Sequence, residues 1–311
     1  REAGNATRKA APAEGSTKGE RTLSGSAAAA AGAGSADVEA GGPASRVGVA
    51  ANRWTVTGLR CLVTGGSKGI GKSTVETLAA QGASVFTCAR NERELAKALG
   101  EWSAKGYKVA GGTHDLSKPE DRAALVKAVA AHFEGGGLDV LVNNVGMNIR
   151  KKTEDFTMAD YHTLMGANVE SCFDMTRLCL PLLKKAKGGG GASVVMNSSV
   201  AGGPTTMKSG SLYGMSKGAM NQFTKLIACE WAKFGIRCNA VAPWYTNTPL
   251  AQQVLANEEY KQQVLSRTPM GRTGEPEEVA DVIAFLCMPA AAFVTGQIIA
   301  VDGGYSAMGF W

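Results

Sequence analysis

Histidine is scarce in this chain: His114, His132 and His162 are the only three, and they do not stand at a spacing typical of metal ligands. No two cysteines form a C-x-x-C pair, and the seven cysteines are scattered singly through predicted strands and helices. An odd number of scattered cysteines is typical of reduced core residues in an intracellular compartment rather than of a disulfide framework. The sequence therefore predicts no metal site and no disulfide bonds.

Long apolar runs and a strong excess of one charge are also absent. Hydrophobic residues make up 44% of the chain, but no uncharged apolar stretch reaches the ~18 residues of a membrane span. Lys and Arg (33) exceed Asp and Glu (27) by six, and these charges are spread along the chain. This modest excess argues against a nucleic-acid-binding protein. Length and composition instead fit one globular domain with a large hydrophobic core.

Large apolar side chains are almost missing from residues 1–53, which are dominated by Ala, Gly and Ser. Such a segment cannot bury enough surface to offset its conformational entropy, so we expect it to be disordered. Its basic residues favour an organellar transit peptide, whereas its acidic residues favour a passive low-complexity tail. Both a plastid and a cytoplasmic location stay open, with the plastid slightly favoured. The remaining residues, 54–311, form the predicted functional domain.

Strand and helix patterns alternate through residues 54–311. The predicted strands are 60–64, 84–88, 107–111, 138–142, 193–197, 236–241 and 297–301, and the predicted helices are 70–81, 91–104, 119–133, 158–184, 212–234 and 276–287. Continuous apolar strands such as 138–142 indicate a sheet that is covered on both faces. The sequence therefore predicts a single α/β domain with a doubly wound, Rossmann-type, mostly parallel sheet. Ligands of such sheets bind at the carboxyl ends of the strands.

A glycine-rich turn follows the first predicted strand and precedes the first predicted helix. Gly65, Gly69 and Gly71 stand in a G-x-x-x-G-x-G pattern in this turn. Gly65 permits the tight turn, Gly69 lets the backbone approach a pyrophosphate, and Gly71 lets helix and strand pack closely. The free N–H groups of the helix N-terminus favour phosphate binding. The alternative is a glycine-rich turn without a ligand.

Tyr213 and Lys217 stand four residues apart, so that on a helix they share one face. A nearby ammonium lowers the pKa of a phenol, which is one way to make a general acid or base. Ser199 follows the strand 193–197, where its hydroxyl can meet the phenol. Taken alone, this spacing of Tyr and Lys usually marks only a helix surface.

Together, Gly65–Gly71, Tyr213 and Lys217 resemble the motifs of the short-chain dehydrogenase/reductase family. Within it the chain is most similar to the plant tropinone reductases and tropinone-reductase-like proteins. That closer resemblance is carried by Asn143–Arg150, Tyr213–Gln222, Val241–Tyr245, Arg267–Glu278 and Val294–Gly304. The resemblance covers residues 54–308.

The resemblance implies a reductase in which Tyr213 gives its proton to a ketone oxygen as hydride arrives from the nicotinamide. Ser199 would hold that oxygen, and Lys217 would bind the nicotinamide ribose and lower the pKa of Tyr213. Asn168 would support a water-linked proton path, or alternatively cap or kink its helix. Ser199 precedes Tyr213 by fourteen residues where the family usually has about thirteen, an extra residue that a surface loop absorbs. Ser199 remains a better candidate than Ser198.

NADP(H) is the expected cofactor. The exit of the second strand, 84–90, has no acid, Ala89 stands where NAD-dependent relatives carry Asp, and Arg90 and Lys68 suit a 2′-phosphate. Thr248 is a candidate ligand of the carboxamide, or else only starts the next helix. The expected cofactor-binding residues are Gly65, Ser67, Lys68, Gly69, Ile70, Gly71, Arg90, Asp115, Leu116, Asn143, Val145, Gly146, Tyr213, Lys217, Pro243 and Thr248.

The expected substrate is a small cyclic or lipophilic ketone. The pocket is expected to be lined from 147–151, 200–212 and 244–265, with Met147, Ser199, Met207, Trp244, Tyr245 and Leu250 as candidates. These stretches offer no firm counter-charge for the amine of tropinone, which favours a broader ketone reductase. A reductase acting on acyl-carrier protein and a non-catalytic cofactor-binding protein are the alternatives. No basic docking patch for an acidic carrier stands out near the pocket loops. The resemblance also implies a homodimer or homotetramer, formed through 158–184 and 212–234.

Overall fold

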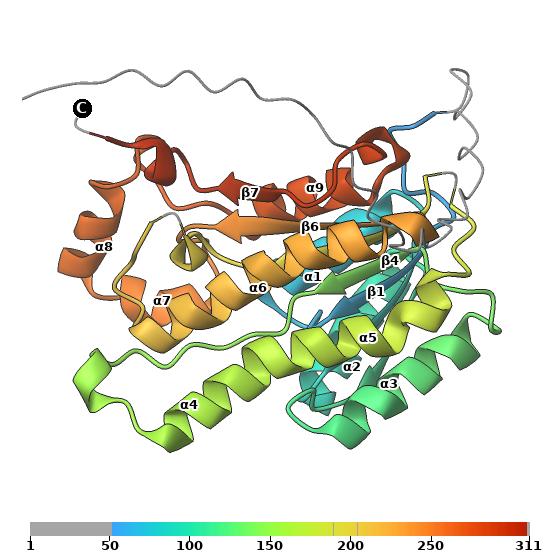
Figure 1. Cartoon of the computed structure of the whole chain (residues 1–311), viewed down its shortest axis with the longest axis horizontal. Coiled ribbons are helices and arrows are strands. Elements are labelled where there is room, and N and C mark those ends of the chain that lie inside the picture. The colour runs from blue at the N-terminus through green and yellow to red at the C-terminus, as the bar shows by residue number, and fades with distance from the viewer. Residues whose placement is uncertain (1–51, 189, 204, 310–311) are drawn as a thin grey trace, which may run out of the picture. The chain divides into compact units, whose positions relative to one another are not determined.

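The computed structural model describes residues 52–188, 190–203 and 205–309 (Figure 1). Every described residue belongs to one compact unit, Gly41–Trp311. The expected disorder and transit peptide in residues 1–53 thus fall almost wholly outside the described residues. Within the described part, no helix is both long and apolar enough to cross a membrane.

Parallel strands form a seven-stranded sheet in the order β3-β2-β1-β4-β5-β6-β7. The strands are β1 Arg60–Thr64, β2 Ser84–Ala89, β3 Val109–Thr113, β4 Val140–Asn143, β5 Ala192–Asn197, β6 Ile236–Pro243 and β7 Ile298–Val301. The direction of winding reverses between β1 and β4, and a ligand crevice opens at such a switch point. The predicted doubly wound sheet is confirmed.

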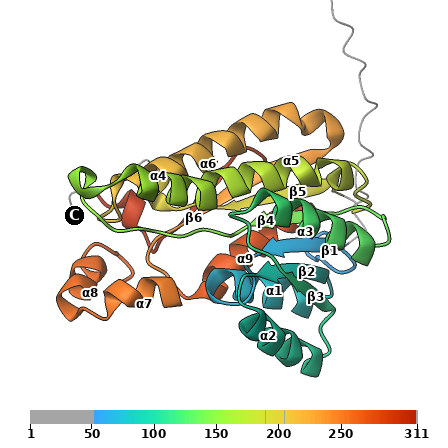
Figure 2. The ribbon, with the colours of Figure 1, turned by 90° about the horizontal axis from the view of Figure 1, so that it is seen from below.

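Helices cover both faces of the sheet (Figure 2). They are α1 Gly69–Ala80, α2 Glu92–Ala104, α3 Pro119–His132, α4 Met158–Met165, α5 Ser171–Leu183, α6 Ser211–Glu230, α7 Pro249–Leu255, α8 Glu258–Leu265 and α9 Pro276–Cys287. Leu78, Trp102 and Ile283 bury α1, α2 and α9 against one face of the sheet. On the other face α3, α5 and α6 form a second apolar core. The predicted covering of both faces is therefore present.

Two predicted strands begin two residues later than expected, and β7 begins one residue later. The segment 107–111 is replaced by β3 from Val109, because the Tyr107 amide donates to Trp102 O and completes the turn after α2. The segment 138–142 is replaced by β4 from Val140, because the Leu138 amide donates to Leu182 O of α5. These amides satisfy helix carbonyls, so they are not available to the sheet.

The predicted helix 158–184 is interrupted. A π-helical turn over Gly166–Glu170 separates α4 from α5. The predicted helix 212–234 ends at Glu230 and continues as a 3₁₀ turn, Ala232–Phe234. Helix α8 was not predicted; Asn257 caps it by accepting a hydrogen bond from the Tyr260 amide at 2.8 Å. In Figures 1 and 2, α7, α8 and the start of α4 lie at the same end of the sheet.

Candidate active site

Two neighbouring cavities lie at the carboxyl ends of the strands. The larger, of about 790 Å³, runs from the glycine-rich turn past the ends of β2 and β3 to Asn144–Met147. The smaller, of about 140 Å³, contains Ser199, Tyr213 and Lys217. Both are lined by Ile70, Asn144, Gly146, Met147, Asn197, Thr248 and Leu250. We call the larger one the cofactor cavity and the smaller one the reaction pocket.

The glycine-rich turn packs too tightly for side chains at its centre. A Cβ at Gly71 would overlap the Gly65 carbonyl oxygen and the Asn144 side chain. Gly65 has φ of 72°, in the left-handed region that favours glycine. At the start of α1, Lys68 makes no capping hydrogen bond and the first turn has no acidic residue. This cradle and its free amide groups fit the pyrophosphate of a dinucleotide.

Asn144 joins the glycine-rich turn to the loop after β4. Its side-chain amide donates to Thr64 O at 2.9 Å and Gly65 O at 3.1 Å, and its oxygen accepts from Asn197 Nδ2 at 2.8 Å. The expected ligand Asn143 is instead buried, donating to Thr176 Oγ1 at 2.9 Å, and does not line the cavity. Successive strand residues point to opposite faces, so Asn143 faces α5 and Asn144 faces the site. In this structure the Asn143 side chain is therefore turned away from the cofactor cavity, and Asn144 lines it in its place.

The far end of the cofactor cavity carries both signs of charge. Arg90, Asp115 and Leu116 line it as expected, together with Glu94 and His114, which the sequence analysis missed. Lys68 forms an exposed ion pair with Glu94 at 3.4 Å. Burial raises the pKa of Asp115, but hydrogen bonds from Ser117 and the charge of Arg90 outweigh it, so the pKa lies below its usual value. Arg90 has no ion-pair partner among the described side chains.

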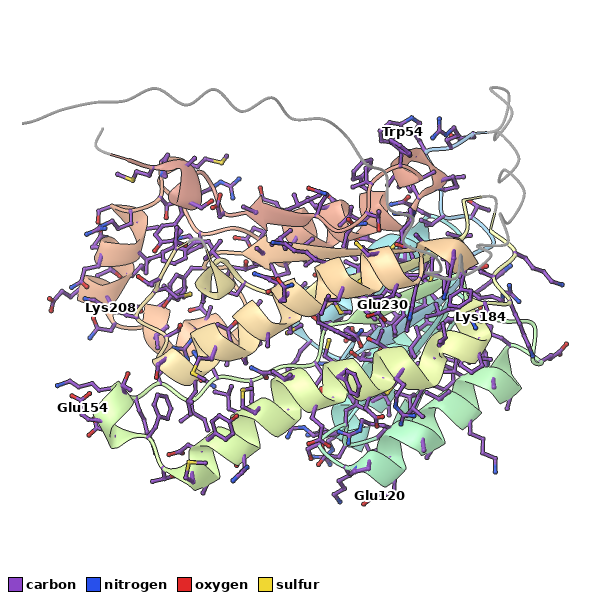
Figure 3. The ribbon with its side chains drawn as sticks, viewed as in Figure 1. Trp54, Glu120, Glu154, Lys184, Lys208 and Glu230 are labelled. Atoms are coloured by element: carbon purple, nitrogen blue, oxygen red, sulfur yellow. The ribbon has the colours of Figure 1, made fainter. Side chains whose placement is uncertain are left out.

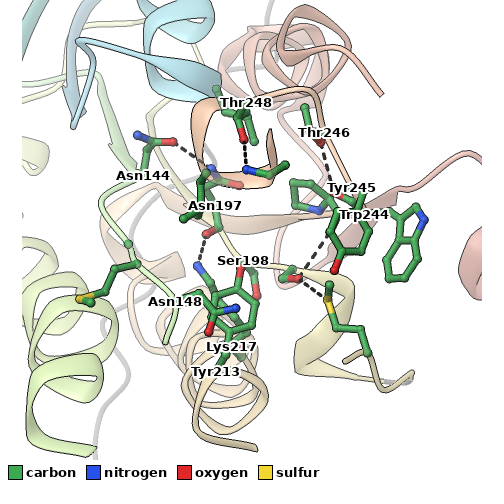
Figure 4. Close-up of a pocket in the computed structure, with 18 of the residues that line it drawn as sticks. Asn144, Asn148, Asn197, Ser198, Tyr213, Lys217, Trp244, Tyr245, Thr246 and Thr248 are labelled. Carbon is green, nitrogen blue, oxygen red and sulfur yellow. Dashed lines mark hydrogen bonds between the residues drawn. The ribbon is translucent and has the colours of Figure 1, made fainter. Parts of the chain in front are cut away.

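Ser199, Tyr213 and Lys217 meet in the reaction pocket, where Figure 4 shows Tyr213 and Lys217 side by side. Lys217 Nζ donates to Asn197 O at 2.8 Å and lies 5.7 Å from the centre of the Tyr213 ring. Ser199 Oγ accepts from the Ala201 amide at 3.1 Å. Ser198 Oγ is turned towards α6, where it donates to Lys217 O at 3.3 Å. The hydroxyl of Ser199 is therefore the better placed of the two.

The pKa of Tyr213 is raised, contrary to the expectation that Lys217 lowers it. Burial raises this pKa, and the hydroxyl of Ser199 and the charge of Arg150 only partly oppose the effect. Burial also lowers the pKa of Lys217 to about 8. A buried phenol without a bound cofactor keeps its proton, which is the form that acts as a general acid.

Replacing Lys217 with methionine is expected to stabilise the cofactor-free protein at neutral pH by about 2–3 kcal/mol, since a buried ammonium is costly. With a folded pKa of about 8, below the value in the unfolded chain, the ammonium destabilises the fold fully below pH 8. This penalty disappears as the pH rises towards the unfolded pKa of about 10.4. Urea unfolding of both proteins between pH 7 and pH 10 should show the advantage of the variant shrinking. A constant difference would contradict a buried, destabilising charge at this position.

Asn168 links three parts of the site from the π-helical turn. Its oxygen accepts from the Met147 amide at 2.8 Å, and its amide donates to Met147 O and Ser216 Oγ, both at 3.0 Å. The side chain is fully buried and lines neither cavity, and the helix departs from α-helical geometry at this residue, as the alternative of a kink expected. Its part in a proton path stays a prediction.

Trp244 and Tyr245 line the reaction pocket, and each is held by a further aromatic side chain. Trp244 stacks on Tyr305 with ring centres 3.6 Å apart, and the Tyr245 and Tyr260 hydroxyls are 2.6 Å apart. Thr248 lines both cavities and also caps α7, accepting from the Ala251 amide at 3.3 Å. All six expected pocket residues line the pocket, as do Asn148 and Arg150, which lie in the expected stretch 147–151 but were not named as candidates. Their polar side chains follow the Asn143–Gly146 motif directly, which was the available signal.

Residues 65–306 match the family described as Enoyl-(Acyl carrier protein) reductase. With the parallel sheet, the glycine-rich turn and the pair Tyr213 and Lys217, this match places the chain in the short-chain dehydrogenase/reductase family. It is an oxidoreductase acting on CH–OH or ketone groups, and the family supports a nicotinamide cofactor.

Curated relatives include tropinone reductase homologs of plants. One from Arabidopsis thaliana, described as chloroplastic, is 51% identical over 83% of this chain and 79% of its own. Another, from Datura stramonium, is 45% identical over 85% of this chain and 98% of its own. Among solved structures, a gluconate 5-dehydrogenase from Burkholderia cenocepacia in complex with NADP and tartrate has a TM-score of 0.77. It is 28% identical and covers 83% of this chain and 98% of its own.

Proposed function

We propose that the protein reduces a ketone to a secondary alcohol with NADPH. The observation that carries this proposal is the meeting of Ser199, Tyr213 and Lys217 in a pocket beside the cofactor cavity. The same pocket contains apolar and aromatic side chains that suit a cyclic or lipophilic ketone: Met147, Met207, Trp244, Tyr245 and Leu250.

Tyr213 acts as the general acid in this proposal. A bound NADPH supplies the hydride. The raised pKa of Tyr213 keeps the phenol protonated at neutral pH, ready to donate to the carbonyl oxygen. Ser199 offers a hydroxyl to the same oxygen and stabilises its developing charge. Lys217, still mostly protonated at pH 7, would hold a ribose hydroxyl and favour the phenolate as it forms.

The choice of NADP(H) over NAD(H) rests on charge at the end of β2. Ala89 and Arg90 line the cofactor cavity there, and the carboxylate that would repel a 2′-phosphate is missing from β2. Glu94 lies nearby but is paired with Lys68. Arg90 is therefore the cation that is available to bind a 2′-phosphate. The NADP in the solved gluconate 5-dehydrogenase agrees with this choice.

Oxidation of NADPH or NADH, followed by absorbance with a panel of cyclic ketones, tests the function. Turnover that prefers NADPH is the expected result. Tight NADPH binding without turnover of any ketone would favour the non-catalytic alternative. Reduction of 3-oxoacyl-carrier protein alone would favour the acyl-carrier alternative suggested by the matched family's description.

Self-association through α5 and α6 is part of the proposal. Phe173 on α5 and Leu226 on α6 are each 49% exposed, and Phe173 contacts Phe223 of α6. Exposed apolar side chains on adjoining helices are typical of an interface. Sedimentation velocity should show a dimer or tetramer at micromolar concentration; a monomer would contradict this.

We also propose a plastid location, supported by the chloroplastic Arabidopsis relative and by the basic residues of 1–53. Fluorescence microscopy of leaf cells expressing residues 1–53 fused to a fluorescent protein tests it. A cytoplasmic signal would favour a low-complexity tail.

A further inference from the structure

A third cavity, of about 720 Å³, adjoins the reaction pocket and is strongly basic. Arg150, Lys151, Lys152 and Lys208 all line it, and no acidic residue is among its described lining residues. Arg150 and Met207 line both this cavity and the reaction pocket. We call it the basic cavity. Its presence corrects the sequence-based view that no basic patch lies near the pocket loops.

Two segments that are distant in the sequence surround the basic cavity. One is the loop between β4 and α4, and the other is the loop between β5 and α6 together with the first turn of α6. Lys208 lies at one end of the described unit, away from Lys184 and Glu230 at the other end (Figure 3). Lys208 donates to Gln263 of α8, so this lining residue lies at the end of the sheet where α7, α8 and the start of α4 gather (Figure 1).

Arg150 is the residue that connects the basic cavity to the chemistry. Its Nε is buried and has no hydrogen-bond partner among the described residues. An unpaired buried N–H is costly, and Arg150 lines both cavities, so a turn of its guanidinium towards an acceptor on a ligand would remove that cost. Burial raises the pKa of Tyr213 and of Tyr245, and in each case the charge of Arg150 opposes the rise. Arg150 is therefore close to the place where the ketone oxygen is expected.

The other groups around the cavity differ in how far their positive charge is neutralised. Lys151 is neutralised by Asp160 at 2.7 Å, and Lys208 donates to the neutral Gln263 at 3.1 Å. Lys152 has no ion-pair partner among the described side chains. The N-terminus of α6 also faces the cavity through Gly210, Ser211 and Gly214, without a capping side chain or an acid in its first turn.

We propose that the natural substrate is a ketone bearing an oxyanion, a carboxylate or a phosphate, which Arg150 binds at the junction of the two cavities. The planar guanidinium fork is well suited to such a group. The remaining charges of the basic cavity attract it. The absence of acidic residues from both described linings opposes a cationic amine such as that of tropinone. This assignment of substrate class rests on the proposed ketone reduction.

The first test compares 4-oxocyclohexanecarboxylate with its neutral methyl ester, in wild type and in Arg150→Gln. Wild type should prefer the acid in kcat/KM, and the substitution should lower the acid-to-ester ratio about 10- to 100-fold, the effect of one charge-assisted hydrogen bond. Lys152→Gln, an exposed position, should lower the ratio about 2- to 5-fold through loss of nearby charge. Lys127→Gln, exposed on α3, is the control and should leave the ratio unchanged.

The second test does not require turnover. Calorimetry measures binding of benzoate and of phenyl phosphate to wild type and Arg150→Gln, each saturated with NADP⁺. Weaker binding of either anion to the variant, by about tenfold, supports the proposal even if no ketone is reduced. If benzoate binds more tightly, the natural substrate carries a carboxylate; if phenyl phosphate binds more tightly, it carries a phosphate. Equal binding to both proteins overturns the proposal, as does equal turnover of acid and ester by wild type. Preference for an acetoacetyl-carrier protein over the keto acid also overturns it and assigns the basic cavity to protein docking.

Discussion

The Tyr213→Phe protein is expected to reduce ketones at least about 100-fold more slowly than wild type, because general acid catalysis contributes effects of that size. The substitution removes only the phenolic hydroxyl from a side chain that lines the reaction pocket. Ser199, Lys217 and the cofactor cavity stay in place, so NADPH should bind nearly as well as before. The expected signature is therefore a loss in kcat with little change in cofactor affinity.

Single-turnover absorbance at 340 nm and NADPH fluorescence titration measure these two properties separately. The control is Tyr107→Phe, which makes the same chemical change outside the three cavities, beside the start of β3. That variant should keep wild-type rates. Full activity in Tyr213→Phe would assign the proton transfer to another group and remove the central residue of the proposed mechanism.

Much of the fold and part of the site could be predicted because their causes are local. A short apolar strand, a glycine turn and an amphipathic helix specify Gly65–Gly71 within a few residues of sequence. The steric reason is visible at Gly71, where a side chain would overlap the turn. The spacing of Tyr213 and Lys217 likewise needs only one helix, α6, to bring the two side chains to one face.

Other features depended on contacts between distant segments. The choice between Asn143 and Asn144 is decided by the last residue of β4, which sequence patterns place only within a few residues. The raised pKa of Tyr213 reflects burial by several elements, an effect larger than the opposing effects of Ser199 and Arg150. Arg150 is the last residue of the motif Asn143–Arg150, but only the folded chain shows that it lines two cavities. The basic cavity likewise joins Lys152 to Lys208, 56 positions apart in the numbered sequence (208 − 152).

Replacing Ala89 with aspartate is expected to reverse the cofactor preference, lowering the NADPH-to-NADH ratio of kcat/KM by about 100-fold or more. Ala89 is the last residue of β2, and together with Arg90 it lines the cofactor cavity. A carboxylate at this position would accept hydrogen bonds from the ribose hydroxyls of NADH. It would also repel a 2′-phosphate and neutralise the neighbouring guanidinium of Arg90.

Steady-state kinetics with both cofactors measure the ratio, and Ala89→Asn is the matched control because it has nearly the same shape without the charge. If charge decides the preference, the asparagine variant should move the ratio much less than the aspartate variant. If both variants lower it equally, crowding at the end of β2 rather than electrostatics is responsible. The variant Arg90→Gln should weaken NADPH binding by about tenfold and leave NADH binding nearly unchanged. Only NADPH presents a 2′-phosphate to that side chain. A wild-type protein that prefers NADH would instead point to the Glu94 carboxylate, 3.4 Å from Lys68, as the group that binds the ribose.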